Sequence, residues 1–225
     1  MDMGEPGAMD QDTPTDGTAP RLMASHPGPV EMFLFDLDGT VTREELLPRI
    51  AAHFGVDEEI AALTRRTIAG DIPFESSLRQ RVEILGRFPV EEVQRVVAGV
   101  EIDPTILDFL HARRDRATIV TGNLDAWLVR LRERIPVPMV TSRVTVADGR
   151  VDRFVEILDK RVAAARFAGR RLCAVGEGHN DLGMFEAAEV SVAYGGVHMP
   201  ADSLFDAATH VAFDPGTLCA FLSQL

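Results

Sequence analysis

The stretch that decides the fold is Met32-Phe33-Leu34-Phe35-Asp36-Leu37-Asp38-Gly39-Thr40. Its first four residues are apolar without interruption, which predicts a short strand buried on both faces, as in a parallel sheet. Asp36 and Asp38 come next, and residues i and i+2 of an extended segment lie on the same side. Gly39 lets the chain turn away, and Thr40 can cap the next segment. The stretch therefore predicts a buried strand that brings two carboxyl groups to one place.

Before this strand, residues 1–29 are rich in Gly, Pro, Ala, Asp and Thr and show no periodicity. Such a composition predicts a disordered acidic tail, to which we assign no function.

After it, residues 46–100 carry apolar side chains at helical spacing, broken by glycines and prolines. We expect several short helices there with no strand between them. Strand-like apolar runs return at residues 117–120, 140–146, 151–157, 172–175, 190–193 and 210–213. Strands that alternate with helices predict an α/β fold with a mostly parallel, Rossmann-like sheet. We assign residues 30–45 and 101–225 to this core, and residues 46–100 to a helical cap inserted after the first strand.

Three polar clusters each lie directly after one of the strand-like runs. They are Asp36 with Asp38, then Thr121-Gly122-Asn123, then Glu177 with Asn180 and Asp181. In an open parallel sheet, ligands bind beyond the carboxyl ends of the strands. We therefore expect the three clusters to meet in one crevice, although they lie far apart in the sequence.

The crevice would hold several carboxylates, which repel one another unless a cation sits among them. Asp36, Glu177 and Asp181 offer the hard oxygen ligands that Mg²⁺ prefers, and a backbone carbonyl near Asp38 completes the expected metal set. The Asp38 carboxyl is placed for proton transfer.

Other residues suit a phosphate. Thr121 offers a hydroxyl donor, and Gly122 allows a close approach of the backbone. Of 23 basic residues, Lys160 is the single lysine. It is either a relic of drift or a compact point charge placed against a phosphoryl group, with Asn180 and Thr121 helping to orient that group.

The four segments Asp36–Thr40, Thr121–Gly122, Lys160 and Gly176–Asp181 resemble, in this order, the four motifs of the haloacid dehalogenase superfamily. The resemblance covers about residues 31–215. It implies a magnesium-dependent phosphomonoester hydrolase in which Asp36 is the nucleophile and forms an aspartyl-phosphate, while Asp38 is the general acid and base.

Within that superfamily the chain looks most similar to the phosphoserine phosphatases. By this resemblance Glu45 would bind the ammonium group of a small zwitterionic substrate such as phosphoserine, Arg81 would bind its carboxylate, and Phe74 would line the apolar wall. The chain departs from the family's pattern at a few positions: Gly39 replaces a serine, Asn123 and Leu124 replace Gly-Phe, and Glu177 replaces an aspartate. Two alternatives stay open: a phosphatase for another small phosphorylated metabolite, and a non-catalytic binding module that keeps the fold.

Composition limits the partners. A net charge of −12 argues against nucleic acid as a partner, because phosphate backbones attract basic surfaces. No apolar run is long enough to span a membrane, and no signal peptide is recognisable, so we expect a cytoplasmic protein. Two cysteines make no disulfide framework, and the six histidines show no metal-ligand spacing. The oligomeric state stays open, with a homodimer as one option.

Overall fold

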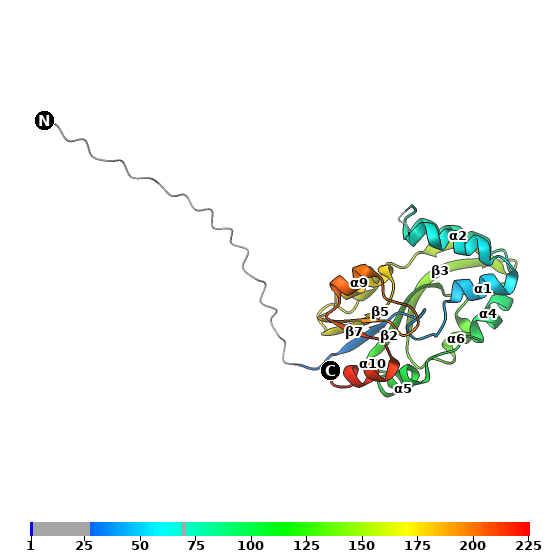
Figure 1. Cartoon of the computed structure of the whole chain (residues 1–225). Coiled ribbons are helices and arrows are strands. Elements are labelled where there is room, and N and C mark those ends of the chain that lie inside the picture. Colours follow the sequence, from blue (N-terminus) through cyan, green and yellow to red (C-terminus); the bar gives the residue numbers. More distant parts are fainter. Residues whose placement is uncertain (2–27, 69–70) are drawn as a thin grey trace.

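The computed structural model describes residue 1 and residues 28–68 and 71–225 (Figure 1). The predicted disordered tail thus lies almost entirely outside the described residues.

The strands are β1 (Met32–Phe35), β2 (Ala117–Leu124), β3 (Met139–Ala147), β4 (Arg150–Glu156), β5 (Leu172–Gly176), β6 (Val190–Tyr194) and β7 (His210–Ala212). The α-helices are α1 (Leu46–Phe54), α2 (Asp57–Ile68), α3 (Phe74–Leu85), α4 (Val90–Ala98), α5 (Pro104–Ala112), α6 (Val129–Arg132), α7 (Lys160–Ala165), α8 (Leu182–Phe185), α9 (Asp202–Ala207) and α10 (Pro215–Leu222). A 3₁₀ turn, η1, spans His179–Asp181.

The described strands form one sheet in the order β4-β3-β2-β1-β5-β6-β7. All neighbouring pairs are parallel except β3 and β4, which form an antiparallel hairpin. The predicted α/β class with a mostly parallel sheet is confirmed. From central β1 the chain builds one half of the sheet through β2 and β3, and later the other half through β5. The strand order therefore reverses beside β1, and such switch points are where ligands bind in open α/β sheets.

The sheet is buried on both faces, as the apolar run of β1 predicts. Phe33 and Phe35 belong to a core shared with α5 and α10, while Met32 and Leu34 pack with α7, α8 and α9 on the other face. Fully burying side chains of this size stabilises the fold by about 1.5–3 kcal/mol each. Because alternate side chains of β1 are buried on opposite faces of the sheet, β1 is held firmly at its centre. The residues that follow β1 therefore have a well-defined position.

β2 extends further than predicted. It continues through Thr121, Gly122 and Asn123 to Leu124, with a register shift against β3 between Thr121 and Leu124. Pairing with β3 resumes after this irregularity. The pattern of apolar residues gave no sign of either the irregularity or the resumed pairing.

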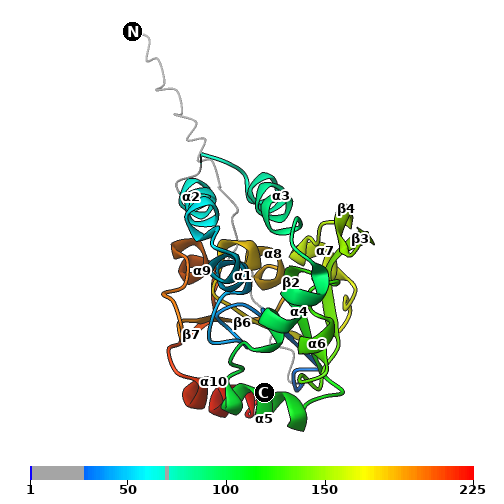
Figure 2. The same cartoon turned by 90° about the vertical axis from the view of Figure 1, so that its right-hand side faces the viewer.

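Helices α1 to α4 occupy the segment for which we predict a cap, and no strand interrupts its described residues. In Figure 2, α2 and α3 stand at the upper end of the molecule, opposite α5 and α10. The two connections to the core run side by side: Thr42 and Ile102 form an antiparallel bridge, and the Arg43 N–H donates to the carbonyl of Glu101 (2.9 Å). The Arg43 side chain also pairs with Asp103 (3.0 Å).

None of the helices in the described ranges is both long and apolar enough to cross a membrane. Cys173 and Cys219 are both free and buried.

Candidate active site

Asp36 stands directly after β1 and is buried, with 6% of its surface exposed. Its backbone N–H donates to the carbonyl of Val175 in neighbouring β5 (2.9 Å). The position of this carboxyl group is therefore set by the pairing of two central strands and not by a mobile loop.

Lys160, the single lysine, reaches the same point from the first residue of α7. Its Nζ donates to Oδ1 of Asp36 and to Oδ1 of Asp181, and only 4% of the residue is exposed. Burial alone would lower the pKa of Lys160, but Asp181 and Asp36 together raise it above its ordinary value. The lysine thus stays charged between two buried carboxyl groups that lie beyond the ends of different strands.

Asp181 is held from both sides. Its Oδ2 accepts the backbone N–H groups of Glu177 (3.0 Å) and Gly178 (2.8 Å), while its Oδ1 accepts the lysine. Gly176 makes this possible, because a Cβ there would lie 2.5 Å from the Asp181 carboxyl carbon. The loop after β5 therefore wraps closely around one fixed carboxylate.

Asp38 is oriented by two donors. Its Oδ1 accepts the backbone N–H of Leu46, the first residue of α1 (2.8 Å), and its Oδ2 accepts the side-chain amide of Asn123. Burial raises the pKa of Asp38 to about 6, while the bonds from Leu46 and Asn123 act in the opposite direction. A carboxyl group with this pKa exchanges protons readily near neutral pH, as a general acid and base must.

Asn123 makes contacts that were not predicted from the sequence. Besides Asp38, its amide donates to the Thr121 hydroxyl oxygen (3.0 Å), which also accepts the Asn123 backbone N–H (3.2 Å). The available signal was a polar side chain at the end of a buried strand, but its partner lies 85 residues away.

The residues expected to bind substrate come partly from the helical segment. Phe74, at the start of α3, lies over Gly122, since its Cζ would be 3.9 Å from a Cβ on that residue. Arg81, further along α3, is buried and has its guanidinium 5.8 Å from the Phe74 ring centroid. Glu45 is the half-buried residue that precedes α1, and Asn180 lies in η1 beside Asp181.

The surroundings of Arg81 act on its charged form in two opposite ways. Burial lowers its pKa, and the carboxyl groups of Glu45 and Asp38 counteract this. Its Nε donates to the Ser77 carbonyl at 3.4 Å, and it makes no ion pair within the described ranges. A planar guanidinium has the geometry for bidentate hydrogen bonding to a carboxylate.

The carboxyl groups predicted to hold a cation are hard oxygen donors, but among the described residues Asp36, Glu177 and Asp181 are not gathered into one cluster of potential ligand atoms. Within the described residues, Oε2 of Glu177 is buried without a hydrogen-bond partner. Burial raises the pKa of Glu177 to about 8, and Asp36 and Glu45 add to the effect. Burial and Asp181 also raise the pKa of Asp36, against the opposing effect of Lys160. Crowded carboxyl oxygens that resist losing their protons are the ligands that Mg²⁺ would stabilise in their charged form.

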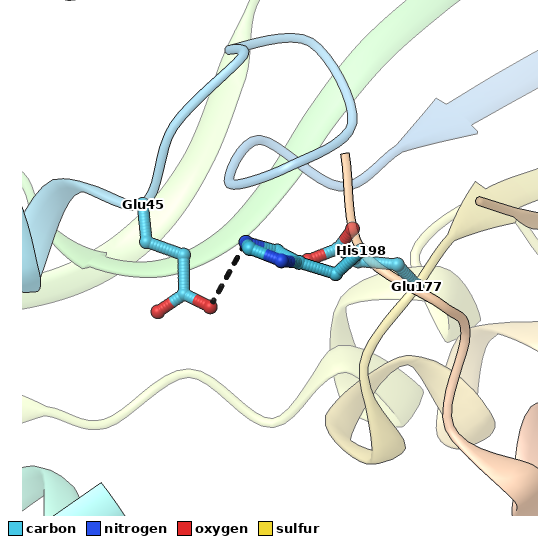
Figure 3. Close-up of side chains that lie close together, drawn as sticks. All are labelled: Glu45, Glu177 and His198. Carbon is cyan, nitrogen blue, oxygen red and sulfur yellow. Dashed lines mark ion pairs between the residues drawn. The ribbon is translucent and has the colours of Figure 1, made fainter. Parts of the chain in front are cut away.

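A further contact involves His198, in the loop between β6 and α9. Its Nε2 lies 3.8 Å from Oε1 of Glu45. Glu45, Glu177 and His198 each offer one atom that could coordinate a metal ion, and these three atoms lie within 4.8 Å of one another (Figure 3). The position of His198 in the sequence did not predict that it lies at the site, because its loop comes close to Glu45 and Glu177 only in the folded chain.

Known proteins resemble this chain in sequence and in structure. The family model of the haloacid dehalogenase-like hydrolases matches residues 33–186. Phosphoserine phosphatase from Halobacterium salinarum is 30% identical over 174 residues, which cover 70% of this chain and 82% of the relative. Its counterpart from Methanocaldococcus jannaschii is 29% identical over 182 residues, covering 73% and 85%. A solved structure of a phospho-aspartyl intermediate analogue of phosphoserine phosphatase shares the fold, with a TM-score of 0.73 at 24% identity over 86% of this chain and 99% of that one.

Proposed function

Since the chain belongs to the haloacid dehalogenase-like hydrolases, we propose that it is a magnesium-dependent phosphatase of the phosphoserine-phosphatase type. The observation that carries the proposal is the buried bridge in which Lys160 joins Asp36 to Asp181 at the carboxyl ends of β1 and β5. A buried nucleophile beside a fixed cation suits attack on a phosphate, whose negative charge must be neutralised as it reacts.

In the first step, an Asp36 carboxylate oxygen attacks phosphorus in line with the leaving alcohol. The P–O bond to the alcohol breaks, Asp38 gives the alcohol its proton, and an aspartyl-phosphate remains. In the second step, Asp38 removes a proton from water. The resulting hydroxide attacks phosphorus and releases phosphate and free Asp36.

Three side chains would steady the phosphoryl group through both steps. Lys160 provides positive charge, and Thr121 and Asn180 provide polar groups around it, while the backbone at Gly122 leaves room for an oxygen. The hydroxyl oxygen of Thr121 accepts bonds from Asn123, so its proton can point toward the phosphate.

Asp36, the backbone carbonyl of Asp38, Glu177 and Asp181 would hold Mg²⁺. When bound, the ion would supply charge neutralisation for the carboxylates and the phosphoryl oxygens.

The substrate is proposed to be a small zwitterionic phosphomonoester such as phosphoserine. Its carboxylate would pair with Arg81 and its ammonium with Glu45, while Phe74 would cover its carbon chain. This assignment is supported by the burial of Arg81 and by the electrostatic influence of Glu45 and Asp38 on it. Together the two charged groups would hold the phosphate toward Asp36.

We further propose that residues 46–100 act as a lid whose closure excludes competing water. Residues 43–46 and 101–105 would be the hinges, because the two connections to the core lie there. The bond from Leu46 N–H to Asp38 ties the start of this segment to the general acid. A cytoplasmic location, a homodimer and the absence of nucleic-acid and membrane partners stay predictions of the sequence.

One observation favours a second candidate, a phosphatase for a different small metabolite. His198 approaches Glu45 from the core, so its imidazole could take the place proposed for the substrate ammonium.

Phosphate release from phosphoserine, from other phosphorylated amino acids and alcohols, and from p-nitrophenyl phosphate tests the proposal, with and without Mg²⁺. We expect magnesium-dependent release with the highest kcat/KM for phosphoserine. Activity on the aryl phosphate but not on phosphoserine would support the second candidate. No release from any of them would indicate a binding module.

A further inference from the structure

Two departures from the phosphoserine-phosphatase pattern, at residues 39 and 177, touch each other in the folded chain. A Cβ built on Gly39 would lie closer than 3.0 Å to Oε1, Cδ and Oε2 of Glu177. Real Cβ atoms do not approach other atoms so closely, so the Glu177 carboxylate occupies the space that a side chain at residue 39 would need. The two residues lie far apart in the sequence, yet they share one volume.

Polar contacts do not explain where this carboxylate sits. Within the described residues its Oε2 is buried without a hydrogen-bond partner, and negative groups surround it. The space over Gly39 is therefore what admits the carboxylate. An aspartate at residue 177 is one methylene shorter and would not reach as far over residue 39.

We propose that Gly39 is the positioning residue for the Glu177 carboxylate, and that glycine at 39 and glutamate at 177 form one compensated pair. The inference rests on the proposed function in taking Glu177 as a ligand of Mg²⁺. It adds that the longer ligand works here because residue 39 has no side chain. Altering a contact that orients a metal ligand typically changes metal affinity about ten- to a hundredfold, and we expect the low end of that range here.

A cycle of three variants tests the pair: Gly39→Ser, Glu177→Asp and the double variant. Binding of Mg²⁺ alone, without substrate, is measured by isothermal titration calorimetry. We expect Gly39→Ser to weaken Mg²⁺ binding about tenfold when residue 177 is glutamate, and less than about twofold when it is aspartate. An equal loss in both backgrounds would overturn the proposal.

Gly39 also has a φ of +66°, so serine there is strained whatever its neighbours. Gly55 is a matched control, with a φ of +69° and nothing within 4 Å of its Cβ position. Gly55→Ser should lower Tm by about 2–8 °C and leave Mg²⁺ binding unchanged. Gly39→Ser should show a similar fall in Tm, because the mobile end of Glu177 can move aside.

Crystal structures of the wild type and Gly39→Ser separate this inference from the proposed function. We expect the Glu177 carboxylate to be displaced in the variant, and an unmoved carboxylate would overturn the pair. If the wild type binds no Mg²⁺, the proposed cation chemistry fails, and the displacement still decides whether Gly39 positions Glu177.

Discussion

The carboxyl ends of β1 and β5 and the helical segment α1–α4 hold their charged residues in opposite ways. At the strand ends, Asp36 and Asp181 share one lysine, and backbone N–H groups fix Asp181 further. In the helical segment, Arg81 is buried, and its Nε donates a long hydrogen bond (3.4 Å) to the Ser77 carbonyl. Asp36 and Asp181 thus find their partners within the protein, whereas the guanidinium proposed for recognition makes no ion pair within the described residues and is proposed to pair with a substrate carboxylate.

The largest effect is expected at the strand ends, where we place the chemistry. Asp36→Asn should reduce kcat/KM by at least about a thousandfold on phosphoserine and on p-nitrophenyl phosphate alike, because both need the nucleophile. Asp108→Asn, at an exposed position of α5, is the control and should stay near wild-type activity. Steady-state kinetics with Tm as a check of folding measure this. Near-native turnover in Asp36→Asn would mean that the strand ends do not carry the reaction.

The second prediction concerns recognition by the helical segment. Arg81→Ala should lower kcat/KM for phosphoserine about ten- to a hundredfold, as expected for a lost charged hydrogen bond of about 1.5–3 kcal/mol. p-Nitrophenyl phosphate has no carboxylate and should change little. Arg79→Ala is the matched control, since Arg79 lies on the same helix but is exposed and paired with Glu75. Equal losses on both substrates would remove the recognition role from Arg81.

The third prediction concerns the single lysine. Lys160→Arg keeps the charge but replaces a compact ammonium with a planar fork in a buried site. We expect kcat to fall at least about tenfold on both substrates, at the low end of what one lost electrostatic contact costs. Arg161→Lys, the exposed neighbour, should be neutral. An unchanged kcat in Lys160→Arg would make the lysine an accident of composition.

The fourth prediction, with the smallest effect, uses pH. Burial raises the pKa of Glu177 to about 8 in the folded protein, well above its ordinary value near 4. The stability contributed by this group is complete below about pH 4 and is lost as pH rises through about 8, since the folded state binds the extra proton. Mg²⁺ displaces that proton and should reverse the loss.

We therefore expect saturating Mg²⁺ to raise Tm by about 5–10 °C at pH 8 and by much less at pH 5.5. Thermal unfolding with Mg²⁺ or EDTA at both pH values measures it. Equal rises in Tm at both pH values would show that the carboxyl groups whose pKa is raised do not bind Mg²⁺.

Local pattern was enough to predict the α/β class and the mostly parallel sheet, but not the extension of β2 to Leu124. The buried run before Asp36 and the alternation of strands and helices indicate it, because the periodicity and length of apolar runs reflect burial directly. The rule that ligands bind beyond parallel strand ends brought three distant polar clusters together.

Contacts between distant side chains could not be predicted in this way. The bond from Asn123 to Asp38, the approach of His198 to Glu45 and the fit of Glu177 over Gly39 depend on side-chain directions in the folded chain. In the sequence, Asn123 and Glu177 were visible as polar residues after strand-like runs and as departures from a family pattern, but their partners became visible only in three dimensions.

Trapping the phosphorylated residue tests whether Asp36 is the nucleophile. Wild-type protein is mixed with phosphoserine and Mg²⁺, quenched, and reduced with borohydride, which converts an aspartyl-phosphate to homoserine. Peptide mass spectrometry then locates the change. The proposed mechanism predicts homoserine at residue 36, and none in Asp36→Asn. Efficient hydrolysis without reduction at residue 36, or reduction at another carboxyl group, would contradict it.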